Sequence, residues 1–320
     1  MPVTLEQARQ NAADAMDLAV IDEFRTSRLI DRIVFDDSIN PLGGGGTLTY
    51  GYRRVKTLST AGFRAINNEY APTEATTEKH AVELKPLGGS YQLDRVLARV
   101  GPAASGENAF QMRQKIRATQ AEFAQAFVNG DSAQNPDAFD GLSKALAGSS
   151  TETDGSGVDW SVTMDEAASF GVLDTLDALM GLLDGAPTFV MSNAAVIGRL
   201  RSAARRTGVY TEAPSPVPGG QDTFRYGTVE FIDPGKRAGS NADIIPLVNG
   251  TSDLYAVRIG LDGLHGVSMA GAPLVQSWLP DFTRSGAVKT GEVEMGPVAL
   301  ALKATRAAAV LRGVRVRPAA

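Results

Sequence analysis

The side chains best suited to acid–base or nucleophilic chemistry are few in this chain and lie far apart. It has no cysteine and two histidines, His80 and His265. Because no G-x-S-x-G motif is present, a Ser-His-Asp triad would have to recruit one of them. His80 falls in a segment expected to project into solvent, and the segment LDGLHGV around His265 is typical of a strand or its edge turn. We interpret both as surface or packed histidines.

Four polar residues in the middle of the chain raise the question of a metal site. They are Asn129, Asp131, Asp137 and Asp140. A calcium loop needs alternating oxygen ligands, a central glycine and a bidentate glutamate at its end. The spacing here supplies none of these. We interpret Asn129–Asp131 as a helix cap and turn, and Asp137–Gly141 as a structured loop.

A glycine run and two carboxylate pairs also fall short of a catalytic pattern. Gly43–Gly46 lacks the Lys-Ser/Thr pair of a phosphate-binding loop and precedes a strand, which indicates a hinge. The pairs Asp36–Asp37 and Glu292/Glu294 are expected in turns or strand edges, as solvated faces rather than acid/base partners. The sequence therefore predicts no catalytic, cofactor-binding or metal-ligating residue, no cofactor and no enzyme activity.

Composition places the chain among globular proteins. It has 320 residues, 43% apolar and 21% charged, with a net charge of −5. From Arg284 onward, seven basic residues against two acidic ones give a local charge of +5. We interpret this as a solvated face in preference to a polyanion contact. The absence of cysteine suits a reducing cytoplasm, and no apolar run approaches the roughly 20 residues of a membrane span.

A long amphipathic helix should position the central part of the chain. Met112, Ile116, Phe123 and Phe127 form one apolar stripe with a helical period, so we expect a helix over 107–128. Asn129–Gly130 should end it, because both residues tolerate the left-handed conformation.

The segment before that helix lacks the residues for a core of its own. A capping box at Thr4 predicts an N-terminal helix. After the glycine run, Thr47 to about Pro86 is expected to form a long two-stranded projection. An isolated hairpin is marginal in water, so this projection indicates a partner surface.

The remaining sequence predicts an α+β domain with a mixed sheet. A small-polar linker, Gly148–Gly157, precedes a helix that should be capped near Thr163 and reach Leu183. A buried strand PTFVMS, a second helix from Asn193 to Gly208 and several short strands follow.

The order of these segments resembles the Hong Kong 97 capsid fold of tailed-phage major capsid proteins, which encapsulin shells share. The stretch NGD…FDGL after the long helix strengthens this resemblance. It implies an α+β chain divided into an N-terminal arm, an extended E-loop hairpin, a peripheral domain with a spine helix, an apical α/β domain and a returning strand segment. The corresponding ranges are 1–42, 43–86, 87–157 with the spine helix at 107–128, 158–287, and 288–320.

The resemblance implies a major capsid protein of a tailed double-stranded DNA bacteriophage. Such a protein self-assembles into pentamers and hexamers of an icosahedral head that encloses the genome. It would be assembled in the host cytoplasm and reside in the virion. Implied partners are copies of itself, portal, scaffolding or decoration proteins, and packaged DNA contacted nonspecifically; no membrane is implied. An encapsulin-like compartment shell is the alternative, and an α/β enzyme with a deep polar pocket in 158–280 is a remote one.

Some capsids of this fold crosslink their subunits covalently through a Lys–Asn isopeptide bond. The expected hairpin offers Lys56 and Lys79, but no asparagine follows Asn249, where the returning segment should supply the partner. The sequence therefore predicts an uncrosslinked shell. The arm begins within a few residues of Met1, so scaffolding is expected from a separate protein or not at all.

Overall fold

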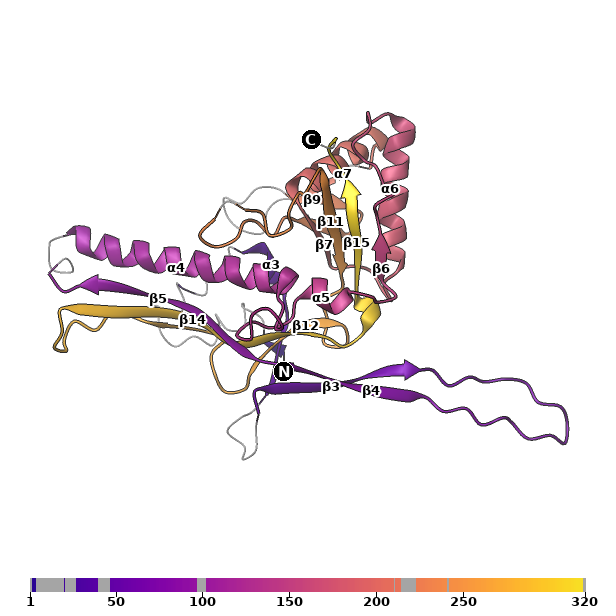
Figure 1. The fold of residues 1–320 in the computed structure, drawn as a ribbon, viewed down its shortest axis with the longest axis horizontal. Coiled ribbons are helices and arrows are strands. Elements are labelled where there is room, and N and C mark those ends of the chain that lie inside the picture. Colours follow the sequence, from indigo (N-terminus) through magenta and orange to yellow (C-terminus); the bar gives the residue numbers. More distant parts are fainter. Residues whose placement is uncertain are drawn as a thin grey trace.

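A computed structural model describes residues 2–3, 20, 27–39, 47–96, 102–209, 211–213, 223–240 and 242–318. It has three parts: an elongated body along a long helix, an upright body carrying two helices, and a hairpin that projects away from both (Figure 1). The predicted helix at Thr4 and the hinge at Gly43–Gly46 lie outside the described residues. Of the arm before residue 27, Val20 is described as helical and buried.

The elongated body, which we call the peripheral body, is a sheet covered by one helix. The sheet order is β1-β2-β12-β14-β13, with β5 also paired to β14. A short helix, α3 (Arg28–Arg32), precedes β2. The strands span β1 (Pro2–Val3), β2 (Phe35–Ile39), β5 (Lys85–Asp94), β12 (Leu264–Met269), β13 (Val275–Trp278) and β14 (Val288–Leu302).

The covering helix is α4 (Pro102–Asn129), and it begins before the predicted start at Glu107. A proline suits the first turn of a helix because its backbone torsion is preset and no N–H is needed there. The predicted apolar stripe is confirmed, since Met112, Ile116, Phe123 and Phe127 are all buried. The stripe holds α4 against β5 and β14 (Figure 1).

The upright body, which we call the apical body, is a seven-stranded sheet with two helices on one face, α6 (Glu166–Gly181) and α7 (Ala194–Thr207). The sheet order is β6-β15-β11-β7-β10-β9-β8. Its strands are β6 (Glu152–Asp154), β7 (Phe189–Ser192), β8 (Thr211–Ala213), β9 (Thr223–Tyr226), β10 (Val229–Ile232), β11 (Thr251–Val257) and β15 (Ala308–Arg315). The helix α5 (Leu142–Leu146) leads into it, and the short 3-10 helix η2 (Thr305–Ala307) precedes β15.

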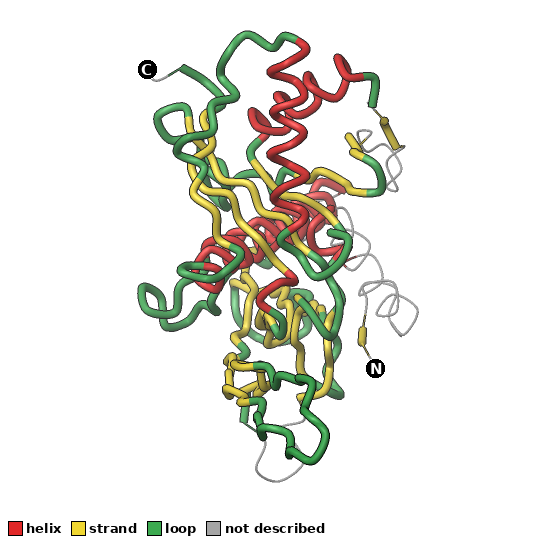
Figure 2. Tube along the Cα trace, turned by 90° about the vertical axis from the view of Figure 1, so that its right-hand side faces the viewer, coloured by secondary structure: helices red, strands yellow, loops and turns green. Residues whose placement is uncertain are grey.

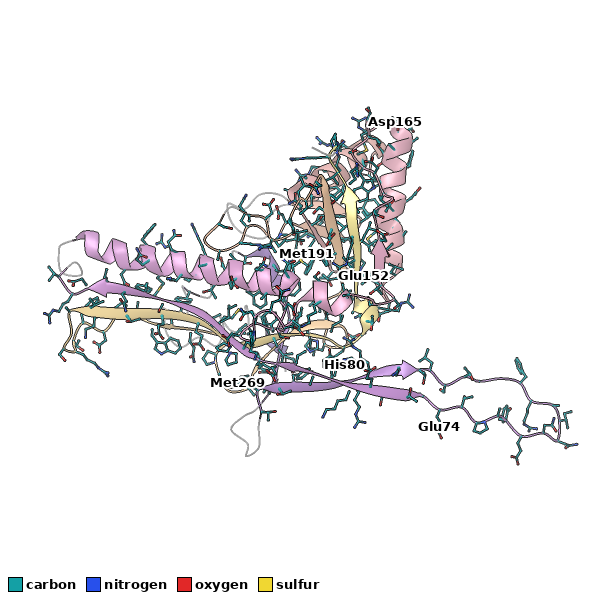
Figure 3. The ribbon with its side chains drawn as sticks, in the orientation of Figure 1. Glu74, His80, Glu152, Asp165, Met191 and Met269 are labelled. Carbon is teal, nitrogen blue, oxygen red and sulfur yellow. The ribbon has the colours of Figure 1, made fainter. Side chains whose placement is uncertain are left out.

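The side chains of β7 point alternately into two cores, and one of these cores is shared by the two bodies. Val190 of β7 packs in the core under α6 and α7, whereas Phe189 and Met191 belong to the core shared with the peripheral body. Met191 accordingly lies low in the apical body, toward α4 (Figure 3). The residues predicted to cap the helices of this body do so with one exception: Asp165, not Thr163, caps α6. Gly208 ends α7 in the left-handed conformation.

The strand pairing differs from the expected division of the chain in two places. β12 and β13 lie within the range 158–287 assigned to the apical domain, yet both pair with β14 in the peripheral sheet. β15 lies within 288–320, assigned to the peripheral domain, yet it pairs with β11 and β6 in the apical sheet. The chain thus passes from the peripheral to the apical body after α5, back before β12, and across again before β15.

The projecting hairpin consists of β3 (Thr49–Thr57) and β4 (Thr76–Glu83), joined by residues 58–75. The two strands pair antiparallel, with Tyr52 opposite His80. Figure 2 shows the hairpin below both bodies, pointing toward the viewer and away from the helices of the apical body.

Candidate functional site

The hairpin tip exposes apolar side chains that its own chain does not cover. Phe63 is 110% exposed, Ile66 91% and Leu58 81%. Side chains of this size rarely remain wholly in water unless they meet a partner surface. The tip is therefore the first candidate for a functional surface.

Side-chain bonds hold this tip in shape where the strand ladder has ended. Thr60 and Thr73 join its two sides, with the Thr60 amide donating to Thr73 Oγ1 at 3.0 Å. Arg64 donates to the Asn68 carbonyl at 3.0 Å and lies over the Tyr70 ring at 5.3 Å. The tip thus presents its apolar groups in a defined arrangement. In Figure 3, Glu74 lies on the hairpin beyond His80, farther from the two bodies.

The cations on the two faces of the hairpin differ in their contacts. Tyr50 and Arg54 face the body, since Tyr50 is buried and Arg54 donates to the Leu302 carbonyl at 2.9 Å. Arg53 lies on the opposite face, directly across from Lys79. Both of these cations are exposed, and neither forms an ion pair within the described residues. The face turned away from the body therefore presents two adjacent cations to a partner.

A second uncovered surface lies on what we call the tongue: β5, β13 and the first half of β14. Its inner face packs against α4 through Tyr91, Val293 and Met295, which are buried. Its outer face carries Glu292 and Glu294 of β14, flanked by small residues of β5 and by Trp278 of β13, which is 46% exposed. The residues opposite the two glutamates are Ser90 and Gly88 on β5 and Trp278 and Gln276 on β13.

The outer face of the tongue is flat and acidic. No helix covers it (Figure 1), and neither glutamate has an ion-pair partner among the described residues. The predicted solvent-facing position of Glu292 and Glu294 is confirmed within a single chain, but the expected turn or strand edge is wrong, because β14 pairs with β5 on one side and with β13 on the other.

The root of the hairpin is fixed by a polar cluster that the sequence did not reveal, and the solvated face predicted for Asp36 is wrong because this carboxylate belongs to the cluster. Tyr50 of β3 donates to Asp36 Oδ2 of β2 at 2.8 Å, and Lys303 Nζ lies 5.2 Å from the Tyr50 ring centre. Burial and the Asp36 carboxylate raise the pKa of Tyr50. His265 of β12 is fully buried and meets the Tyr50 ring edge-on at 5.8 Å. No local signal linked these residues, because they come from separate segments.

The two histidines lie in different surroundings, and the structure does not bring them together with a serine. His80 stacks on Tyr52 at 5.7 Å on the hairpin. His265 is a packed histidine in a strand, as predicted, and β12 pairs with β14 on one side and β2 on the other.

The polar residues after α4 surround a lysine. Lys144 Nζ lies 2.6 Å from Asp131 Oδ1 and 2.8 Å from Asp140 Oδ1. The Lys144 ammonium holds the pKa of the Asp131 carboxyl below its ordinary value. Asp137 donates its backbone N–H to Asn135 Oδ1 at 3.1 Å. The structured loop predicted from the sequence is therefore present, and one lysine pairs with two of the nearby carboxylates.

Gly130 ends α4 for a different reason from the one expected. It does not adopt the left-handed conformation. A Cβ at Gly130 would lie 2.2 Å from the Phe139 carbonyl oxygen, and a Cβ at Gly141 would lie 2.4 Å from that of Ala126. The two glycines let the loop close onto the end of α4, where Gly141 donates to the Gly130 carbonyl at 2.9 Å. Close backbone approach is what requires glycine here.

Asn129 ties α4 to the apical body. Its Nδ2 donates to the Ile244 carbonyl at 2.8 Å and lies 3.2 Å from Gln125 Oε1. The stretch NGD…FDGL thus combines a contact between the bodies, two close-packed glycines and an acidic loop in which one lysine pairs with two carboxylates.

Neither a metal-ligating cluster nor a membrane-spanning helix is found among the described residues. In that part of the chain no group of three or more His, Cys, Asp or Glu side chains is placed to hold a metal ion. Its helices include none that is both long and apolar enough to cross a membrane.

Comparison with known proteins finds likeness in structure only. No protein-family model and no curated protein matches the sequence. Among solved structures, the capsid of Myoviridae phage XM1 matches with a TM-score of 0.52 and 13% identity, over 88% of this chain and 89% of that one. The capsid of the native GTA particle matches with a TM-score of 0.54 and 16% identity, over 83% and 85%.

An encapsulin aligns equally well. The SrpI encapsulin of Synechococcus elongatus PCC 7942 matches with a TM-score of 0.53 and 16% identity, over 84% of this chain and 83% of that one. All of these neighbours form shells, and each is covered nearly end to end. The protein therefore has the Hong Kong 97 fold of viral capsid and encapsulin shell proteins.

Proposed function

We propose that this protein is the major capsid protein of a tailed double-stranded DNA bacteriophage. It would form pentamers and hexamers of an icosahedral head, assembled in the host cytoplasm. The observation that carries the proposal is the hairpin, whose tip exposes Phe63, Ile66 and Leu58. The shell-forming neighbours support a structural rather than a catalytic role. Portal, scaffolding or decoration proteins would be further partners.

The hairpin has a fitting partner surface on a second copy. Arg53 and Lys79 face away from their own body as neighbours across two strands. Glu292 and Glu294 stand two residues apart on the outer face of the tongue, about 7 Å along the strand. Neither pair has an ion-pair partner among the residues that the structure describes. The two adjacent cations of one hairpin thus complement the acidic outer face of the next tongue.

The shape of the molecule suits a head-to-tail arrangement. The tongue and the hairpin extend from the body in opposite directions (Figure 1). A contact between two different surfaces of identical chains repeats from copy to copy and closes into a ring when the rotation allows. Each exposed ion pair contributes only about 0.2–1 kcal/mol, so the apolar tip and the many repeats must supply most of the stability.

Contact with packaged DNA would fall to α4 rather than to the C-terminal basic residues. Five of the latter are engaged within the chain: Arg312 pairs with Glu152, Arg284 pairs with Asp281, Arg306 donates to Leu182, Lys289 donates to Ser285, and Lys303 lies over Tyr50. On α4, Arg113 is exposed and makes no such contact among the described residues. Contacts with DNA would be nonspecific and would weaken with salt.

Negative-stain electron microscopy of the purified protein tests the proposal. Closed shells, or pentameric and hexameric rosettes, are expected, and a compact lone particle would refute it. Shells that protect double-stranded DNA from nuclease support the capsid function. Shells that retain a protein cargo and no DNA would instead assign the encapsulin function, which the SrpI match favours.

A charge exchange tests the docking surface. Arg53→Glu with Lys79→Glu should prevent assembly, as should Glu292→Lys with Glu294→Lys. The four changes together should restore it, because the pairs are then reversed. Asp174→Lys, on the exposed side of α6, serves as the control and should assemble normally. If the quadruple variant folds but does not assemble, the proposed contact between the hairpin and the tongue is contradicted.

A further inference from the structure

His265 is a buried titratable group that the assembly proposal does not use. Its ring is fully buried, and within the described part of the chain neither Nδ1 nor Nε2 makes a hydrogen bond of good geometry. A buried polar group without a partner is costly, and a buried charge without one is costlier still. The neutral ring is tolerated as a packing element against Tyr50, but an imidazolium ion would not be.

The charged groups around His265 act in opposite directions on a proton bound to its ring. Lys303 approaches from the segment after β14 and opposes protonation, whereas Asp36 of β2 favours it. Asp262, in the turn before β12, also interacts favourably with the ring. Tyr50 of β3 presents its ring edge, and its hydroxyl is committed to Asp36. The facing part of β14, from Ala299 to Leu302, carries no charge.

The net effect is a histidine that resists protonation while the cluster is closed. Burial, and then the Lys303 ammonium, lower the pKa of His265 from 6.5 to about 4. The Asp36 carboxylate and the backbone of Gly260 and Gly263 counteract this only in part. When the root of the hairpin opens and water reaches the ring, its pKa returns toward the ordinary value.

The same cluster sets the direction of the hairpin. Tyr50 joins β3 to β2 through Asp36, and Arg54 joins β3 to the end of β14 through the Leu302 carbonyl. The Leu84 amide donates to the Leu48 carbonyl at 2.7 Å across the same root. Displacing the Tyr50 ring would therefore release the first strand of the hairpin from the body.

We propose that the His265–Tyr50–Asp36–Lys303 cluster is an acid-sensitive latch, and that protonation of His265 frees the hairpin root. The device belongs to the single chain and does not depend on the proposed capsid function. Its sign follows from linkage: the open state binds the proton more tightly, so acid favours opening. The open-to-closed ratio should rise from about pH 6.5 down to about pH 4, by up to about 300-fold.

Distances between paired spin labels on the full chain measure this ratio, because the chain has no cysteine of its own and labels can be placed at introduced ones. With one label at Thr77→Cys on β4 and the other at Asp174→Cys on α6, the fraction of chains with a displaced hairpin should rise as the pH falls. A control pair within the apical body, Asp174→Cys with Arg206→Cys, should show no such change. Particles and unassembled chains can be measured separately, so a failure to form shells would leave the result readable.

Three variants make the test specific. His265→Phe keeps an aromatic ring and should abolish the pH dependence, whereas His80→Phe should retain it. Lys303→Met removes the opposing cation, so the rise should be smaller and should level off at a higher pH. This third variant remains informative if His265→Phe does not fold. A flat wild-type profile, or an unchanged profile in His265→Phe or Lys303→Met, would overturn the proposal.

Discussion

Shortening two apolar side chains at the hairpin tip should weaken assembly and leave the stability of the single chain unchanged. In the double variant Phe63→Ala/Ile66→Ala, both side chains are removed from positions that are 110% and 91% exposed in the single chain. They contribute no burial to the fold, so the melting temperature of the unassembled chain should not change. On a neighbour, each would contribute about 2 kcal/mol through its burial. A loss of about 4 kcal/mol per subunit corresponds to roughly a thousandfold rise in the critical concentration for assembly.

Light scattering against protein concentration gives that critical value, and calorimetry gives the melting temperature. Phe123→Ala is the matched control, because Phe123 is 1% exposed and packs against Phe35, Phe127 and Phe139. It should destabilise the chain itself by about 3–5 kcal/mol. A lower melting temperature in the tip variant would show that the tip packs on its own body. An unchanged critical concentration would show that the tip meets no partner.

Three further outcomes are expected. Gly141→Ala places a Cβ 2.4 Å from the Ala126 carbonyl oxygen and should cost about 1–3 kcal/mol in urea unfolding, whereas Gly171→Ala, in open space on α6, should stabilise slightly. Asn129→Ala removes the bond to Ile244 and should cost about 1 kcal/mol by the same measurement; no loss would mean that this link is dispensable. Assembly should weaken in high salt if the charged faces dock, and salt-independent light scattering would argue against their contact.

Local sequence patterns predicted those elements that are specified by residues close together in the chain. The stripe from Met112 to Phe127 specifies which face of α4 is buried, and Asn193 and Gly208 bound α7 through bonds within a few residues. The projection was foreseeable for a related reason, since a segment so poor in apolar residues cannot bury itself.

Pairing between distant strands was not foreseeable in the same way. Leu264–Met269 and Ala308–Arg315 are both apolar strands, and nothing in their sequences says which sheet each joins. The hairpin root was missed for the same reason, because Asp36, Tyr50 and His265 meet only after three strands are placed. Gly130 was assigned a torsional role when its actual role, close approach to Phe139, depends on a tertiary contact.

The position of β15 determines when a newly synthesised chain can complete its apical sheet. This strand is the last one in the chain, yet it lies between β6 and β11 inside the apical sheet. A ribosome still holding residues 308–315 would leave β6 unpaired and β11 with an open edge. Under the proposed assembly, a nascent chain would therefore not complete its apical sheet, and so would not join a growing particle, until translation has passed β15.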